Sequence, residues 1–279
     1  MKILLIIAVL IVAGLLFINV SGDKFNEKVQ RDVRQITEGV LSAPAKQFTY
    51  DQLRGLPEPV QKYFKYALKD GQELIRIVRL KQTGEFRAKE SDRWVPLVAE
   101  QYFTTESPSF VWHARLKPTP YAWIEARDIY YKGSGFTEGK LLSAFPLIFD
   151  SGKEFELSAL ARFLSEAPWY PTALLPGKNL EWKSLDSHSA TAVVNDGGYS
   201  VSAVFTFDDN GEIIKLTTED RYRGVNGKKE RIRWTAYYKN YQELNGVKIP
   251  TEVEAEWKLQ KGIFQYAKLK VTEIRYNDR

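Results

Sequence analysis

The sequence has no cysteine among its 279 residues and only two histidines, His113 and His188. Without cysteine the chain cannot form disulfides, cysteine–zinc sites, iron–sulfur clusters, thiol nucleophiles or cysteine-linked lipid anchors. Two histidines are too few for a multi-histidine metal site, so no metal and no other cofactor is expected. Internal repeats of 20–50 residues and low-complexity segments are lacking as well.

Charge and aromatic content are those of an ordinary globular protein. Apolar residues make up 44% and charged residues 27%, which excludes disordered, collagen-like and multi-span membrane chains. The net charge is only +5, from 40 basic and 35 acidic residues, so no nucleic-acid partner is expected. Aromatic residues reach 13%, which favours β-sheet.

Residues 3–18 form an unbroken apolar run, extended by Asn19 and Val20. Eighteen helical residues span about 27 Å, enough to cross the core of a bilayer. Because the run is longer than the apolar region of a usual signal peptide, residues 3–20 predict a membrane anchor. A cleaved signal ending at Val20-Ser21-Gly22 remains the alternative.

The side of the membrane is less directly encoded. Lys24, Lys28, Arg31 and Arg34 follow the apolar run, and the positive-inside rule read literally places the domain in the cytosol. Long domains cross membranes largely regardless of such charges. A cysteine-free, aromatic β domain behind one anchor suits the extracytoplasmic space, and we expect it there, with the orientation left open.

Two apolar stripes at helical spacing follow in the chain. One covers residues 57–70 and the other residues 153–166, and both are expected to dock on a sheet. Residues 23–49 read as a helical linker with sparse apolar positions. The expected organisation is an anchor or signal segment over 1–22, this linker, and a single curved β-sheet domain over 50–279.

From residue 74 onward the apolar period changes to two, as in strands. The predicted strands cover 74–86, 94–104, 109–116, 121–131, 136–145, 180–186, 190–195, 199–207, 212–223, 229–242, 247–259 and 263–276. Antiparallel strands of this length must coil. The predicted fold is therefore mainly β (α+β), a large curved antiparallel meander or half-barrel with two covering helices, behind an N-terminal transmembrane helix.

The turn residues predict the strand register. Asn245-Gly246 is a strong two-residue hairpin signal, and it places Trp234 opposite Trp257. A three-residue loop at 260–262 then places Val253 opposite Leu269 and Glu254 opposite Lys268. Asn226-Gly227 places Arg223 opposite Glu230 and Asp220 opposite Arg233. Apolar and charged pairs separate onto opposite faces, as cross-strand pairing requires.

Several patches together resemble an uncharacterised bacterial family, a domain of unknown function, over about residues 50–276. The patches are residues 56–64 (LPEPVQKYF), 108–112 (PSFVW), 128–135 (DIYYKGSG), 162–171 (RFLSEAPWYP), Arg221-Tyr222-Arg223, and Pro250 with Trp257. The resemblance implies no activity and no catalytic residue. Separately, the long-stranded meander with one interrupting helix is similar in architecture to the half-barrels of lipoprotein-localisation carriers.

The candidate ligand site is the concave face of the sheet. Trp234, Tyr238 and Trp257 share one face, and two helices of 14 residues cannot cover strands of 36–50 Å, about the length given by 3.3 Å per residue. We therefore expect Trp234 and Tyr238 to line a cavity. Arg162 and Glu166, spaced i,i+4 beside Trp169, either bind a polar head group or hold the loop that follows their helix.

The remaining charged features favour structural roles. Seven cations between 221 and 239 read as a solvated face, and His188 in Asp186-Ser187-His188-Ser189 reads as turn chemistry. His113 alternates with Trp112 on a strand, so the two side chains point to opposite faces. No spacing selects two of the 35 carboxylates as a catalytic pair.

Three functions remain open from the sequence. The first is a membrane-anchored β domain that binds an apolar or lipid-like ligand, with Trp234, Tyr238, Trp257, Arg162, Glu166 and Trp169 as the ligand-binding residues. The second is an interaction or scaffold protein of the cell envelope without a small ligand, whose protein partner the sequence does not identify. The third is a carboxylate-based hydrolase; no catalytic residue is assigned, and binding is favoured over catalysis.

Overall fold

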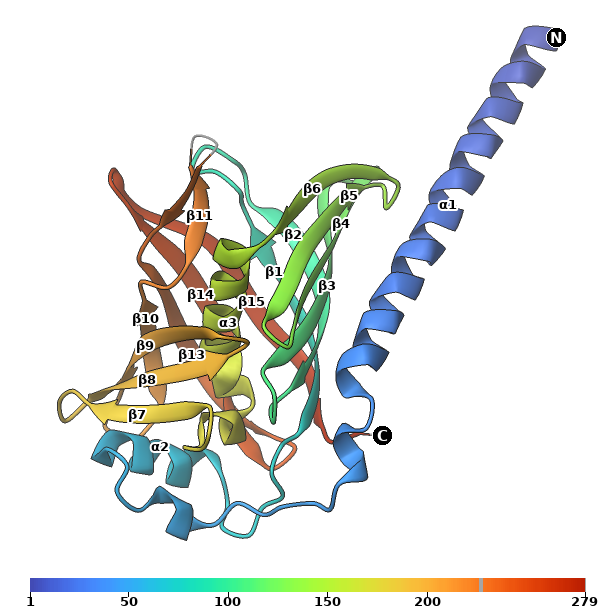
Figure 1. Cartoon of the computed structure of the whole chain (residues 1–279). Coiled ribbons are helices and arrows are strands. Elements are labelled where there is room, and N and C mark those ends of the chain that lie inside the picture. Colours follow the sequence, from blue (N-terminus) through green and yellow to red (C-terminus); the bar gives the residue numbers. More distant parts are fainter. Residues whose placement is uncertain (226–227, 279) are drawn as a thin grey trace.

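The computed structural model describes residues 1–225 and 228–278, in which thirteen strands form one antiparallel sheet (Figure 1). Its order is β6-β5-β4-β3-β2-β1-β15-β14-β13-β10-β9-β8-β7. The first six strands are β1 (Ile77–Phe86), β2 (Val95–Thr104), β3 (Ser109–Thr119), β4 (Ala122–Tyr131), β5 (Ser134–Leu141) and β6 (Phe145–Ser151). The others are β7 (Leu180–Ser184), β8 (Ser189–Asp196), β9 (Tyr199–Phe207), β10 (Ile213–Thr218), β13 (Trp234–Leu244), β14 (Val247–Leu259) and β15 (Gly262–Tyr276). The mainly antiparallel, curved sheet predicted from the sequence is confirmed.

The predicted register of the last three strands is confirmed, but one loop is not. Trp234 lies opposite Trp257 in β13 and β14, and Val253 lies opposite Leu269 in β14 and β15. The β14–β15 loop is two residues long, because Leu259 already pairs with Gly262. A β-bulge between Ala255 and Glu256 restores the predicted offset.

Three predicted strands are wrong in extent. Residues 136–145 reverse direction, because Leu142 and Ser143 adopt positive φ and form the turn between β5 and β6. The segments 212–223 and 229–242 each divide in two, and their ends form a separate ribbon of β11 (Tyr222–Val225) and β12 (Lys228–Arg231).

The ribbon separates at Asp220, whose carboxylate accepts a hydrogen bond from the Ser202 backbone N–H (2.7 Å) and so replaces a ladder bond. Arg223 pairs with Glu230 as predicted. The carboxylate of Asp220 contacts Arg231 rather than the expected Arg233, which instead contacts Glu219 at 2.5 Å. The turn Asn226-Gly227 lies outside the described residues.

Helix α3 (Lys153–Glu166) lies inside the curve of the sheet, with the halves of the sheet on either side of it (Figure 1). It has the predicted bounds, Gly152 precedes it, and no side chain caps its first turn. Two short 3-10 helices, Ala167–Trp169 and Pro171–Leu174, continue the chain along the inner face. Helix α2 (Glu58–Ala67) covers one end of the curve, preceded by the 3-10 helix Tyr50–Leu53.

Helix α1 (Lys2–Thr37) runs without a break from the apolar segment into the sequence that reads as a linker. Its first twenty residues are almost wholly exposed, whereas Phe25, Val29, Val33 and Ile36 are buried on the outer face of the sheet. A short 3-10 helix, Val40–Ser42, follows. The second half of α1 is therefore an integral layer of the domain.

Buried charges add to this outer layer. The Asp32 carboxylate of α1 accepts a hydrogen bond from Arg127 of β4 at 2.5 Å, and Arg127 also contacts Glu138 of β5 at 2.9 Å. Burial raises the pKa of Asp32, and the guanidinium of Arg127 works against that rise. Lys28 reaches Glu138 at 3.5 Å. The helix is thus held to β4 and β5 by charge as well as by apolar contact.

Two glycine turns meet where the sheet curves back on itself. A Cβ built on Gly197, between β8 and β9, would lie 2.1 Å from the Cα of Gly133, between β4 and β5. Beside this contact the hydroxyl of Tyr130 donates to Asp196 at 2.9 Å. The contact joins strands from opposite halves of the sheet, and only glycine allows the approach.

Replacing Gly197 by alanine should therefore destabilise the protein more than replacing its neighbour. Gly198 also has a positive φ, but nothing lies within 4 Å of its Cβ position. Gly198→Ala should cost about 1–2 kcal/mol because alanine disfavours the left-handed backbone. Gly197→Ala should cost about 1–3 kcal/mol more, because its methyl group would overpack the contact with Gly133. Urea unfolding of the full chain in detergent, followed by tryptophan fluorescence, measures both. Equal losses would show that the turns do not touch.

Candidate functional site: a cavity between α3 and the concave face

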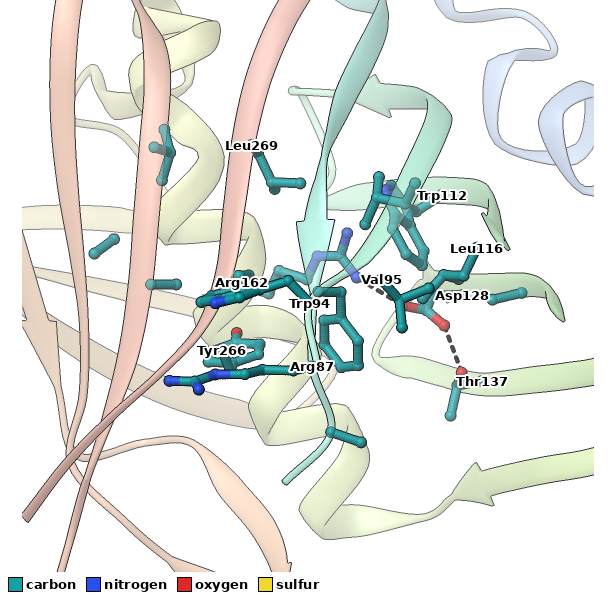
Figure 2. Close-up of a pocket in the computed structure, with 18 of the residues that line it drawn as sticks. Arg87, Trp94, Val95, Trp112, Leu116, Asp128, Thr137, Arg162, Tyr266 and Leu269 are labelled. Atoms are coloured by element: carbon teal, nitrogen blue, oxygen red, sulfur yellow. Dashed lines mark hydrogen bonds and ion pairs between the residues drawn. The ribbon is translucent and has the colours of Figure 1, made fainter. Parts of the chain in front are cut away.

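A cavity of about 730 Å³ lies between α3 and the inner faces of the strands on either side of it (Figure 2). Most of its wall is apolar. The apolar lining includes Phe86, Trp94, Val95, Leu97, Trp112, Leu116, Ile124, Ala126, Ile148, Trp169, Trp234, Ala236, Val253, Ala255, Ala267 and Leu269. The charged lining consists of Arg87, Asp92, Arg93, Asp128, Arg162, Glu166 and Arg221.

Arg162 is the centre of the polar cluster on the α3 side. Its Nε donates to Glu166 at 2.9 Å and its Nη1 donates to Asp128 of β4 at 2.7 Å. The other oxygens are also engaged, since Glu166 accepts from Gln101 at 2.8 Å and Asp128 accepts from Thr137. Burial alone would lower the pKa of Arg162, but the two carboxylates outweigh it and raise that pKa.

The geometry of this cluster indicates a structural role, in which Arg162 joins α3 to the sheet. Arg162 lies over the rings of Phe110 and Trp112, at 5.1 and 4.9 Å. Its two carboxylate partners come from β4 and the end of α3, and these in turn are bonded from β2 and β5. Every carboxylate oxygen of Asp128 and Glu166 already accepts a hydrogen bond. The pair is therefore poorly suited to acid–base chemistry, which needs an oxygen free to reach a substrate.

Arg221 differs from Arg162 in that no carboxylate of the described residues lies within ion-pair distance of it. It lies on the connection between β10 and β11, with its guanidinium 4.6 Å from the ring of Trp234 and 5.7 Å from that of Trp257. Its Nε is buried and lacks a hydrogen-bond partner among the described residues. Burial lowers the pKa of Arg221, although the carboxylates of Glu166 and Asp128, which lie beyond ion-pair distance, work against that effect.

The aromatic wall is held in place by hydrogen bonds at its polar tips. The indole N–H of Trp234 donates to the hydroxyl of Tyr266 at 3.0 Å, and the hydroxyl of Tyr238 donates to the carbonyl of Ser165 at 2.6 Å. The indole N–H of Trp169 donates to the carbonyl of Pro250 at 3.1 Å. Because their polar atoms are occupied, these residues present apolar faces to the cavity.

Five of the six predicted ligand-binding residues line this cavity: Arg162, Glu166, Trp169, Trp234 and Tyr238. Trp257 does not, because it lies beside Tyr266 and Arg221 and is covered by them. Sequence reasoning missed Arg221, which was assigned to a solvated basic face. The sequence placed Arg221 inside one predicted strand, and the division of that strand, which brings Arg221 beside Trp234, has no signal in the sequence.

The two histidines lie outside the cavity. His113 contacts the carboxylate of Glu125 at 2.6 Å on the outer face, next to Phe25 of α1. Burial raises the pKa of Glu125, but hydrogen bonds from His113 and Arg115 outweigh it and leave that pKa lowered. His188 lies in a turn where its backbone N–H bonds Asp186. Over residues 1–225 and 228–278, no group of three or more His, Asp or Glu residues could hold a metal ion.

The cavity and the apolar half of α1 share one end of the molecule. The connection between β1 and β2, which supplies Arg87, Trp94 and Val95 to the lining, lies at the end toward which α1 extends (Figure 1). The ring of Phe17 in α1 lies 6.2 Å from that of Phe145, the first residue of β6. Strand β6 is an edge of the sheet, and its Phe145, Leu147 and Phe149 are exposed.

Fold and site together define a class of protein: a curved β half-barrel whose concave face holds one helix and an open apolar cavity. The chain belongs to DUF6544, a family of unknown function whose model matches residues 46–269. The resemblance noted from the sequence is thereby confirmed. No match was found among curated proteins.

Solved structures with a similar fold include a LolA superfamily protein from Nitrosomonas europaea, with 12% identity and a TM-score of 0.42 over 79% of this chain and 93% of that one. A putative outer membrane lipoprotein-sorting protein domain from Vibrio parahaemolyticus has 10% identity and a TM-score of 0.42, covering 79% and 91%. A DUF1329 family protein from Desulfovibrio piger has 8% identity and a TM-score of 0.43, covering 82% and 91%. At these identities the similarity concerns the fold alone.

The two arginines of the cavity should differ in what they contribute to stability. Arg162→Gln leaves Asp128 and Glu166 buried without their cation, and it should cost about 3–5 kcal/mol. Arg221→Gln removes only contacts with two rings, and it should cost about 1 kcal/mol. Urea unfolding of the two variants against the parent chain measures both losses. Similar losses would mean that Arg221 has a buried partner too.

Proposed function

We propose that this chain is a membrane-anchored, extracytoplasmic domain that holds an apolar or lipid-like ligand in the cavity beside α3. The cavity is the observation that carries the proposal. Its volume of about 730 Å³ falls within the usual range for ligand sites, and its wall is apolar with a few charged groups at defined positions. A space of this kind favours an amphiphile over a fully polar ligand.

The anchoring follows from α1. It is long and apolar enough to cross a membrane, and its apolar half is not covered by the rest of the chain. A soluble helix with this surface would expose a large apolar patch, and such patches mark contact with a membrane or a partner. The docked half, from Phe25 to Ile36, then holds the domain next to the bilayer surface.

The cations after the apolar run are the argument for the cytosolic side, and an ion pair in the structure weakens that argument. Of the four cations after the apolar run, Lys28 lies close to the carboxylate of Glu138. A folded domain of more than 200 residues also crosses largely regardless of short-range charge. A domain without cysteine is unaffected by the oxidising conditions of that compartment.

A specific feature also favours the second candidate, an envelope scaffold. Edge strand β6 exposes Phe145, Leu147 and Phe149, and an uncovered apolar edge can accept a strand from a partner. The same residues lie beside the membrane helix at Phe17, so a bilayer surface would cover them equally well. The hydrolase candidate loses support because Asp128 and Glu166 are both held by Arg162.

Filling the cavity should prevent ligand binding. Ala126 lines the cavity, whereas Val98 is exposed on the opposite face of β2. The full chain released from detergent micelles in native mass spectrometry should carry a co-purified amphiphile. Ala126→Phe should lose that mass because the ring occupies its space, and the control Val98→Phe should retain it. Retention by both variants, or a bare parent chain, would contradict ligand binding at this site.

The apolar segment should stay attached to the mature protein. Residues 20–24 continue the helix into its docked half, so no extended stretch is present there for a signal peptidase. Intact-mass measurement of the protein from its native membrane should therefore show the full chain. A mass lower by residues 1–22 would identify a cleaved signal.

A further inference from the structure

We propose that Arg221 binds the anionic head group, a carboxylate or a phosphate, of the amphiphile whose apolar part occupies the cavity. This inference rests on the proposed function and specifies the chemistry of its ligand. It starts from the contrast between the two arginines of the cavity wall, one fully paired and the other without a counter-charge.

The cavity offers Arg221 no carboxylate of its own. Asp128 and Glu166 are both engaged by Arg162 and by a second donor each. Over residues 1–225 and 228–278, no carboxylate oxygen lies within ion-pair distance of the Arg221 guanidinium. Arg221 is half-buried and its Nε is buried, and proteins normally pair such a partly desolvated charge or reserve it for a ligand.

The unsatisfied polar atoms of the wall point to the same kind of group. Among the described residues that line the cavity, two side-chain atoms are buried without a partner: Nε of Arg221 and Nε1 of Trp112. Both are N–H donors. A ligand with several acceptor oxygens would satisfy such donors, as a carboxylate or a phosphate does.

The overall charge of the cavity wall is positive, which also favours an anionic ligand. Four arginines line the cavity, Arg87, Arg93, Arg162 and Arg221, against three carboxylates, Asp92, Asp128 and Glu166. The connection between β1 and β2 supplies Arg87, Asp92 and Arg93, with a net charge of +1, and the inner wall supplies two arginines against two carboxylates. Because both inner carboxylates are in ion pairs with Arg162, Arg221 is the inner cation available to an anion.

The backbone around Arg221 is fixed before any ligand binds. The next residue, Tyr222, donates its backbone N–H to Ser158 of α3 at 2.8 Å, and the carbonyl of Arg221 accepts from Ile232 at 3.0 Å. The rings of Trp234 and Trp257 support the guanidinium by cation–π contact. Such a preorganised cation loses little conformational freedom on binding.

Native mass spectrometry of the full chain in dodecyl maltoside micelles tests the inference with three added probes. Oleate carries a carboxylate, 1-oleoyl lysophosphatidate carries a phosphate, and methyl oleate has the same chain without charge. The variant is Arg221→Gln, and Arg221→Lys tests whether charge without the planar fork suffices. Arg233→Gln is the matched control, because it removes the same charge at an exposed position paired with Glu219.

The parent chain and Arg233→Gln should bind at least one anionic probe about tenfold or more tightly than methyl oleate, as expected for a charge-assisted contact. Arg221→Gln should abolish this preference while methyl oleate binds as before, and Arg221→Lys should keep part of it. Tighter binding of lysophosphatidate identifies a phosphate ligand, and tighter binding of oleate identifies a carboxylate.

Two results would overturn the inference, and they are distinguishable. Equal binding of charged and uncharged probes by the parent chain, or equal losses for all three probes in Arg221→Gln, would contradict the role of Arg221 and leave the cavity as an apolar ligand site. Binding of no probe by the parent chain would contradict the proposed function, and the inference would fail with it.

Discussion

Helix α3, with 14 residues, covers only part of the concave face of a thirteen-stranded sheet, with α2 at one end, and the rest of the molecule depends on that mismatch. The helix spans about 21 Å, whereas the 15 residues of β15 span about 50 Å. Apolar side chains near α3 form a closed core, and those beyond it surround a cavity. The curvature that makes the sheet wrap α3 is held by the contact of Gly133 with Gly197 and by Arg162, which joins the helix to β4. The cavity is therefore a direct consequence of the fold and not a local defect of packing.

Much of the fold could be predicted because its signals are local. Asn245-Gly246 permits positive φ at both turn positions, and this alone fixed Trp234 opposite Trp257. The length of the β14–β15 loop was mispredicted because the bulge near Tyr266 has no sequence pattern of its own. An extra residue in the loop and an extra residue in the strand give the same pairing beyond the bulge, so the pairing alone does not distinguish them. The breaks at Leu142 and Asp220 were missed for a related reason. Both depend on contacts that the finished sheet makes, a left-handed turn beside α1 and a carboxylate directed at Ser202.

The candidate site was predictable where side chains follow periodicity and not where they follow tertiary contacts. The i,i+4 spacing of Arg162 and Glu166 placed them together, and strand alternation placed Trp234 and Tyr238 on one face. The partners Asp128, Thr137 and Gln101 come from three strands distant in sequence, and no local pattern connects them. Arg221 sits among many cations, so composition suggested a solvated face. Its neighbours pair with Asp220, Glu219 and Asp150 as that interpretation requires, and only the departure of the β11–β12 ribbon from the sheet turns Arg221 inward.

The docking of α1 determines how the cavity meets its surroundings. A flexible tether would let the domain rotate freely, whereas Phe25, Val29 and Ile36, together with the Asp32–Arg127 pair, fix the helix to β3 and β4. In the proposed arrangement the bilayer therefore has one defined position relative to the sheet, and Phe17 beside Phe145 brings edge strand β6 to its surface. Ile148 of this strand lines the cavity and is itself exposed, as are its neighbours Leu147 and Phe149. In the proposed arrangement this one strand therefore borders both the cavity and the membrane side.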